Sequence, residues 1–390
     1  MGFSPRAVLI TAVLAVLIVP LFEQSLAAQE AARVNFQIQL PPFDSVTGME
    51  VVAISAQSDS NVWGVGHSSV RWDGTNWTLI PIVQMGGGTL VLDGIAALSS
   101  TNVWAVGPFV NSGGRTQEAV EHFDGTSWKV FPDVSLIGEN LDGLVEDESL
   151  TSISALSADD IWAAGYVGIE PPCDCIVPFI EHFDGTKWNL SGVLLTANSP
   201  DNFQFLEGIS ALSDTDVWAV GYLSLNGALN GAAQAFHFDG TQWSQVTAPS
   251  GQMARFNAVT AIASNDVWAV GATQTNQRTF IEHFDGAQWR VVASPNTSDP
   301  TNILLGVGAV SSKSVWAVGQ HFKAQGSPLV EHFDGTRWSI VPAPGESNSF
   351  GTTLFGASGL ASGHLWLGGD FIATHVPPLR PFVLFTTQGQ

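Results

Sequence analysis

The chain has 390 residues, 45% of them apolar, so it is long enough and apolar enough to bury a large core. Its 35 acidic and 13 basic residues give a net charge of −22, which argues against nucleic acid and anionic membrane surfaces as partners, because both need basic patches. Charged residues make up only 12% of the chain, so much of its polar surface must come from uncharged side chains and glycine.

The N-terminal segment has the layout of a secretory signal. Arg6 precedes an apolar run from Ala7 to Phe22, and Ser25 and Ala27 are small residues at the positions that a signal peptidase reads. The run of 16 residues is short for a membrane span, which takes about 20. We predict a signal at residues 1–27 and a secreted, extracellular or cell-surface protein. The alternative is an uncleaved N-terminal anchor.

The rest of the chain is built from an internal repeat, whose first motif is DVWAVG in its commonest form. A small or branched apolar residue, the marker residue, precedes the tryptophan of this motif by nine residues in every copy. Such fixed spacing predicts two short strands joined by a tight hairpin. The seven pairs of marker residue and tryptophan are Ile54/Trp63, Ile95/Trp104, Ile153/Trp162, Ile209/Trp218, Val259/Trp268, Val307/Trp316 and Ala357/Trp366.

A second motif, HFDGTxW in its commonest form, follows in each unit. Its aspartate precedes its tryptophan by four residues in all six copies, whereas the intervals before and after the motif vary in length. Asp-Gly is the strongest short hairpin signal, so we expect another pair of strands around it. The six pairs of aspartate and tryptophan are Asp73/Trp77, Asp124/Trp128, Asp184/Trp188, Asp239/Trp243, Asp285/Trp289 and Asp334/Trp338.

Each unit therefore predicts four short antiparallel strands, a to d, which is the composition of a β-propeller blade. Ahead of the first unit, Phe36-Gln37-Ile38 matches strand d, and after Trp366 the chain ends on a degenerate strand c. We predict an all-β, seven-bladed β-propeller of four-stranded antiparallel blades in one domain, residues 34–390. The N-terminal strand would complete blade 7 and close the ring, and strand a, rich in small residues, would be innermost. An open solenoid, the alternative, would not need this split unit.

The paired DVWAVG and HFDGTxW motifs resemble those of largely uncharacterised secreted bacterial β-propeller repeat proteins. The DGTxW hairpin is similar to the turns of Asp-box and kelch-type propellers. The resemblance covers nearly the whole chain after the signal and implies the fold. It implies little about activity, because propellers host unrelated functions.

The repeated polar and aromatic residues are interpreted as scaffold. A histidine recurs on strand c, and its copies would lie too far from one another to share a metal ion, so we expect each to hydrogen-bond within or between blades. The aspartate of each Asp-Gly turn should accept hydrogen bonds from its own turn. All 14 tryptophans occupy repeat positions and should pack between blades, with sugar stacking as the alternative. The histidines are His122, His182, His237, His283 and His332.

Ligand binding is expected where the repeat varies. In a four-stranded meander the b-to-c and d-to-a connections emerge on one face, which we predict to be the binding face. Candidate ligand-binding residues near this face are Glu139, Asp142, Glu146, Asp147, Glu148, Tyr166 and Tyr222.

The acidic segment at residues 137–149 carries oxygen ligands of the kind that Ca²⁺ prefers, but its spacing matches no EF-hand, and a solvated acidic loop is the simpler interpretation. We expect no cofactor and no metal site. Cys173 and Cys175 are the two cysteines of the chain and predict a small local disulfide, with loop thiols as the alternative. Two thiolates fall short of a four-ligand zinc site.

Three classes of function fit the pattern. We favour a noncatalytic propeller that binds a protein or glycan. The second class is a propeller-based glycoside hydrolase or lyase, which would use paired carboxylates. Asp93 and Glu207 share one position, two residues before the marker residue, but nothing in their spacing brings them together.

The third class is a structural module of a surface assembly. No catalytic residue is predicted, because the chain has no hydrolase, metalloprotease or dinucleotide-binding motif and lacks the arginine cluster and tyrosine nucleophile of a sialidase.

Overall fold

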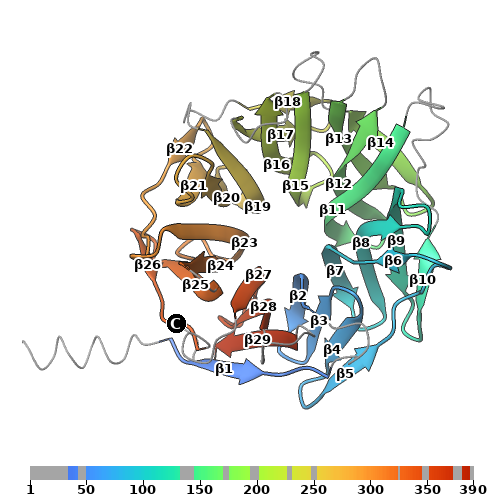
Figure 1. Cartoon of the computed structure of the whole chain (residues 1–390), viewed down its shortest axis with the longest axis horizontal. Helices are drawn as coiled ribbons and strands as arrows, with labels where there is room; N and C mark the ends of the chain where they lie inside the picture. Colours follow the sequence, from blue (N-terminus) through green and yellow to red (C-terminus); the bar gives the residue numbers. More distant parts are fainter. Residues whose placement is uncertain are drawn as a thin grey trace, which may run out of the picture.

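The strands are arranged radially around a central axis, as Figure 1 shows in a computed structural model of the chain. The structure describes residues 34–42, 50–131, 145–169, 175–193, 202–225, 231–246, 253–323, 326–344, 351–371 and 380–386. Their regular structure is entirely β-strand, which confirms the predicted all-β propeller. Within these ranges we find no helix that could cross a membrane. The predicted signal at residues 1–27 lies outside them.

Each repeat unit is a meander of four strands, a to d. Strand a lies nearest the axis, and strands b, c and d follow in order toward the outside (Figure 1). The strands a are β2 (Ala53–Ser58), β7 (Gly94–Ser99), β11 (Val145–Ser157), β15 (Asn202–Ser213), β19 (Ala254–Ala263), β23 (Thr301–Ser311) and β27 (Thr352–Gly359). The strands b are β3 (Asn61–Val65), β8 (Asn102–Val110), β12 (Asp160–Ile169), β16 (Asp216–Leu225), β20 (Asp266–Thr273), β24 (Ser314–Phe322) and β28 (Leu365–Phe371).

The two outer positions of each unit complete the meander. The strands c are β4 (Ser69–Trp72), β9 (Thr116–Phe123), β13 (Cys175–Phe183), β17 (Ala233–Phe238), β21 (Thr279–Phe284), β25 (Gly326–Phe333) and β29 (Arg380–Thr386). The strands d are β5 (Trp77–Ile80), β10 (Trp128–Phe131), β14 (Trp188–Val193), β18 (Trp243–Gln245), β22 (Trp289–Val291), β26 (Trp338–Ile340) and β1 (Phe36–Gln39). The short β6 (Thr89–Leu90) pairs with β8.

The hydrogen-bonded sheets correct the prediction of seven four-stranded blades. Five sheets each hold one four-stranded blade, and β6 is added to one of them. The sixth sheet has eight strands, because a parallel pairing of Ile176 on β13 with Phe203 on β15 joins two neighbouring meanders. The prediction of seven separate four-stranded blades is therefore wrong. β13 and β15 meet through extensions that lie beyond the repeated motifs, so the repeat does not encode this junction.

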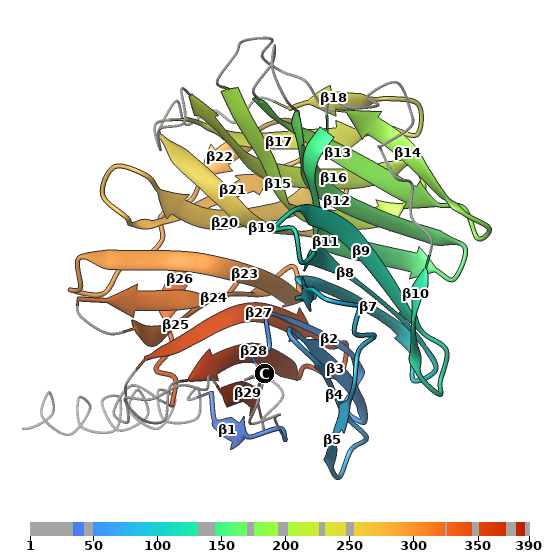
Figure 2. The same ribbon diagram turned by 45° about the vertical axis from the view of Figure 1, so that its right-hand side comes forward.

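The ends of the chain share one sheet. β1 pairs antiparallel with β29, with Phe36 opposite Thr386 and Ile38 opposite Leu384. Figure 2 shows β1 on the outer side of β29, in the position that a strand d takes elsewhere. The predicted pairing of the Phe36-Gln37-Ile38 segment with the C-terminal strand is confirmed.

Aromatic clusters hold neighbouring units together. The ring of Trp218, on a strand b, lies 4.6 Å from Phe284 and 5.5 Å from Trp289 of the next unit. Each buried indole removes a large apolar area from water. The predicted packing between units is confirmed, and these ring faces are covered by protein. The equivalent clusters are Trp63 with Phe123 and Trp128, Trp104 with Phe183 and Trp188, Trp162 with Phe238 and Trp243, and Trp268 with Phe333 and Trp338.

The repeated histidine belongs to a hydrogen-bonded group inside its own unit. His237 Nε2 lies 2.9 Å from Asp216 Oδ1, and Trp218 donates its indole N–H to the same oxygen at 3.1 Å. The rings of Trp218 and His237 stack with centroids 4.4 Å apart. The predicted structural role of these histidines is confirmed. The group recurs as Asn102/Trp104/His122, Asp160/Trp162/His182, Asp266/Trp268/His283 and Ser314/Trp316/His332.

The Asp-Gly turns also have the predicted geometry. Asp239 Oδ1 accepts the backbone N–H groups of Thr241 at 2.8 Å and Gln242 at 2.9 Å, together with the Thr241 hydroxyl. The Thr241 hydroxyl and these two N–H groups favour the carboxylate and lower the pKa of Asp239 to about 2. Gly240 has φ of 88°, a conformation that glycine adopts without strain.

A buried glutamate beside the histidine was not anticipated from the sequence. Glu331 is fully buried, and its Oε2 accepts the Ser294 hydroxyl at 2.8 Å, just beyond strand d of the preceding unit. Glu121 is also fully buried and accepts the N–H of Val83 at 3.0 Å in the same way. Burial raises the pKa of Glu121 to about 7 and that of Glu331 to about 8. Through these hydrogen bonds the glutamates of strand c hold the segment that connects the preceding unit to the next one.

Candidate functional site

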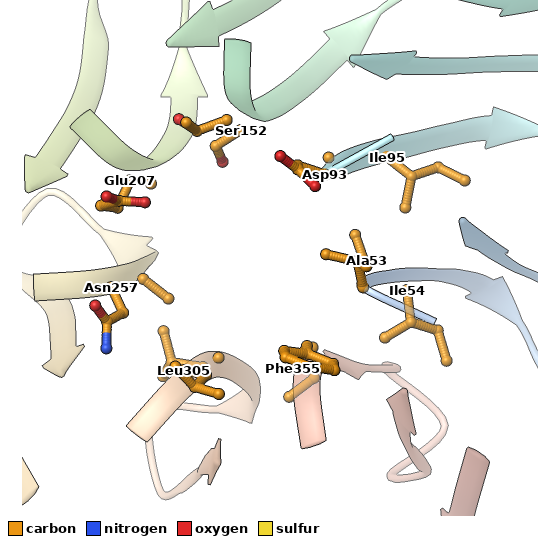
Figure 3. Close-up of a pocket in the computed structure, with 18 of the residues that line it drawn as sticks. Ala53, Ile54, Asp93, Ile95, Ser152, Glu207, Asn257, Leu305 and Phe355 are labelled. Carbon is orange, nitrogen blue, oxygen red and sulfur yellow. The ribbon is translucent and has the colours of Figure 1, made fainter. Parts of the chain in front are cut away.

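A cavity lies on the axis of the propeller. It encloses about 380 Å³ and is lined by strands a and the residues directly before them, from all parts of the ring (Figure 3). This volume lies within the range of about 300 to 1,000 Å³ that is usual for small-molecule sites. Because the strands of each unit are antiparallel, the b-to-c and d-to-a connections leave at one end of this channel. That end is the predicted binding face.

Most of the side chains that define the cavity stand at β-bulges. The register of β15 against β16 shifts between Leu206 and Gly208, so Glu207 is the extra residue of a bulge. A bulge re-aims the side chain of its extra residue, and Figure 3 shows Glu207 directed to the axis. Equivalent shifts in four other strands a leave Thr151, Asn257, Leu305 and Phe355 as bulge residues.

The glycine that ends the DVWAVG motif makes room for the bulge. Gly221 lies opposite Leu206, and a Cβ on Gly221 would come within 1.9 Å of the Phe205 carbonyl oxygen. A Cβ on Gly271 would come within 2.0 Å of the Arg255 carbonyl oxygen. No side chain fits at these distances. The repeated glycine is therefore the sequence signal from which the cavity could have been predicted.

The cavity has two unlike walls (Figure 3). Polar side chains come from neighbouring strands on one side and apolar side chains from the opposite side, which makes the cavity amphipathic. We call the first set the polar wall: Asp93, Thr151, Ser152, Glu207 and Asn257. We call the second set the apolar wall: Val52, Ala53, Leu305 and Phe355.

Two side chains of the polar wall, Thr151 and Asn257, already donate hydrogen bonds to backbone carbonyls. The Thr151 hydroxyl lies 2.8 Å from the Leu206 carbonyl oxygen, and the Asn257 side-chain amide donates to the Leu304 carbonyl at 2.6 Å. By contrast, no residue that the structure describes donates a hydrogen bond to the carboxyl groups of Asp93 or Glu207. The wall therefore offers acceptors to the cavity and few donors.

Burial raises the pKa values of both Glu207 and Asp93. Burial raises the pKa of Glu207 to about 7, the Arg255 charge opposes the rise, and Asp93 adds to it. Burial likewise raises the pKa of Asp93 to about 7, with Glu50 adding to the rise and His67 opposing it. Sequence spacing alone did not bring these two acids together, whereas the structure places both in one cavity.

The two predicted tyrosines lie beside Glu207. Phe205 separates them, with its ring centroid 4.9 Å from that of Tyr166 and 4.9 Å from that of Tyr222. Burial, followed by the nearby Glu207, raises the pKa of Tyr222 to about 12, and the same two causes raise the pKa of Tyr166. Both phenols are therefore protonated at neutral pH.

The predicted acidic segment is only partly described. Asp147 is exposed and accepts the N–H of Thr116 at 2.6 Å, whereas Glu148 is 3% exposed. Glu146 falls within β11, and Glu139 and Asp142 lie outside the described residues. In the part of the chain that is described, no group of three or more His, Cys, Asp or Glu side chains could hold a metal ion. The prediction of a solvated acidic loop at this segment, with calcium binding as the alternative, is not tested by the described residues.

The cysteine pair is also only partly described. Cys175 is buried on β13 and is disulfide-bonded. Cys173 lies outside the described residues.

Comparisons with known proteins show the fold. No protein-family model and no curated protein matches the chain, so the particular repeat family stays a prediction. Similar solved structures include the WD40 β-propeller domain of Doa1, with 9% identity, a TM-score of 0.58, and coverage of 91% of this chain and 98% of that one.

Two further solved structures are similar to this chain. YCF48 bound to D1 peptide has 12% identity and a TM-score of 0.55, covering 90% of this chain and 95% of that one. A Hadza microbial sialidase has 12% identity and a TM-score of 0.51, covering 84% of this chain and 73% of that one. At these identities the likeness concerns the fold alone.

Proposed function

We propose that this protein is a secreted or cell-surface, noncatalytic propeller that binds a protein or glycan ligand at its variable-loop face, with part of the ligand entering the channel cavity. The single observation that carries the proposal is that two carboxyls, Asp93 and Glu207, face one cavity and receive no hydrogen bond from the described residues. Both side chains are partly exposed to the channel and receive no hydrogen bond from the described residues, so a ligand with hydrogen-bond donors can supply their partners.

The construction of the cavity supports the same conclusion. Five lining residues stand at bulges in successive strands a, yet they differ in chemistry from unit to unit. The backbone repeats while the side chains vary, as expected where a common scaffold carries a specific site. A peptide is bound by the similar YCF48 structure, but the proposal rests on the cavity of this chain.

A hydrolase or lyase is the second candidate, because Asp93 and Glu207 have raised pKa values near neutrality and share one cavity. Such a pair could act as general acid and base.

The proposal is tested by screening residues 28–390 on glycan and peptide arrays, with and without Ca²⁺. The double variant combines Asp93→Asn and Glu207→Gln. The matched control is Asp214→Asn, which changes an exposed hairpin residue. We expect saturable binding that the double variant loses and the control keeps. Binding that survives in the double variant would place the site elsewhere, and absence of binding on both arrays would favour a structural module.

Catalysis is tested on the same preparations. Array glycans incubated with the protein should be recovered unchanged by chromatography. Turnover that disappears in Glu207→Gln would overturn the noncatalytic part of the proposal and establish the acid and base pair instead.

A further inference from the structure

The lining of the channel cavity restricts the chemistry of the group that can enter it. Glu207 sits deep in the wall with its carboxyl directed into the cavity and receives no hydrogen bond from the described residues (Figure 3). Asp93 faces the same cavity and also receives no hydrogen bond from the described residues. The donors of Thr151 and Asn257 are taken by backbone carbonyls. A complementary group must therefore be a hydrogen-bond donor.

Charge restricts the group further. The chain carries a net charge of −22, and two partly buried carboxyls line one cavity. Arg255 affects Glu207 through its charge and not through a hydrogen bond. A cation with several N–H donors would neutralise the carboxyls and supply their missing hydrogen bonds together, and such charge-assisted bonds are the strong ones.

The apolar wall indicates what carries the cation. Leu305 and Phe355 lie across the cavity from Glu207 and Asp93 (Figure 3). A bare metal ion would leave this wall in contact with water, and the described residues provide no metal-binding group of three or more ligands. A chain of methylene groups that ends in an ammonium satisfies both walls, because its stem packs on apolar surface while its head donates three hydrogen bonds.

We propose that the channel cavity binds a primary alkylammonium group, with the ammonium against Glu207 on the polar wall that also carries Asp93, and the alkyl stem against Leu305 and Phe355. The group is either a lysine side chain or a free alkylamine, and both present the same chemistry. This inference rests on the proposed binding function and names the group that the cavity recognises.

The test is calorimetric titration with two probes, n-butylamine and Nα-acetyl-lysine methylamide, in an amine-free buffer. The neutral controls are n-butanol and the Nε-acetylated form of the lysine probe. We expect both amines to bind, both neutral analogues to fail, and the tighter amine to identify the source. Equal binding of the neutral analogues, or no binding of either amine, would overturn the inference.

Variants locate the binding. Glu207→Gln and Asp93→Asn should each weaken amine binding by about tenfold or more, and Asp214→Asn should leave it unchanged. Leu305→Trp fills the cavity from the apolar wall and should abolish binding while both carboxyls stay in place, so the test survives if a carboxyl variant fails to fold. Circular dichroism checks the fold of each variant. Amine binding that persists in all three cavity variants would refute the site.

The outcome is separable from that of the proposed function. Array ligands that are lost in Leu305→Trp but are not displaced by either amine would keep the binding function and reject the ammonium. Amine binding without any array ligand would keep the cavity chemistry and reject the protein or glycan ligand.

Discussion

Glu331→Gln should change how the stability of this protein depends on pH. The carboxyl is fully buried, and burial raises its pKa from the usual 4.5 to about 8, against the opposing hydrogen bond from Ser294. Because the pKa is higher in the folded state, the protonated form stabilises the fold. The contribution is complete below about pH 4.5 and is lost as the pH rises through about 8.

The magnitude follows from the shift. One pKa unit corresponds to about 1.4 kcal/mol. Between about pH 5 and about pH 9, ionisation of Glu331 should remove roughly 4 kcal/mol from the free energy of unfolding. The glutamine variant is neutral throughout and keeps an acceptor for Ser294, so its loss over the same interval should be smaller by that amount.

Urea titrations followed by tryptophan fluorescence at several pH values measure the effect. Asp214→Asn, which changes an exposed hairpin carboxyl, is the control and should follow the unmodified protein. Glu331→Leu is a second variant. In the last repeat unit the equivalent position on strand c is already a leucine, Leu384 of β29, which lies opposite Leu367 of β28. If the glutamine variant and the unmodified protein lose stability in parallel between the two pH limits, the buried carboxyl is not the cause.

Three further predictions concern the scaffold. Asp216→Ala removes the acceptor shared by Trp218 and His237 and should cost about 2 to 4 kcal/mol of unfolding free energy; a loss below about 0.5 kcal/mol in a urea titration would contradict the shared bond. Gly221→Ala places a Cβ against the Phe205 carbonyl and should cost about 1 to 3 kcal/mol while also weakening ligand binding in the cavity; unchanged stability would refute the close approach. A chain without β1 leaves the edge of β29 unpaired and should self-associate in light scattering, whereas a stable monomer would show that the edge needs no cover.

The strands, their order and the closing pair were predictable because their signals are local. Asp-Gly turns and DVWAVG hairpins set short strands at fixed spacing, and the tryptophans mark the faces that pack. The eight-stranded sheet was not predictable in this way. It depends on the meeting of Ile176 and Phe203 in segments that the repeat does not share.

The cavity was predictable only in part. Bulge residues such as Glu207, Leu305 and Phe355 share a backbone geometry and no side-chain chemistry, so a comparison of units by residue type passes over them. Gly221, which leaves room for the bulge, was the sequence feature that could have indicated the cavity. The buried Glu331 was missed for another reason: a glutamate between apolar residues is ordinarily assigned to solvent, and its partner Ser294 belongs to a different unit.

The pairing of β1 with β29 has a consequence for biosynthesis. The ribosome makes residue 36 before its partner, residue 386, and about 350 residues separate the two in the chain. At roughly 5 to 20 residues per second, these events are separated by about twenty seconds to about a minute. Throughout that time β1 has no partner strand, so the ring cannot close while the ribosome is making the strands between β1 and β29. The ring closes only after β29 has left the ribosome, and a truncation that removes β29 leaves β1 without its partner.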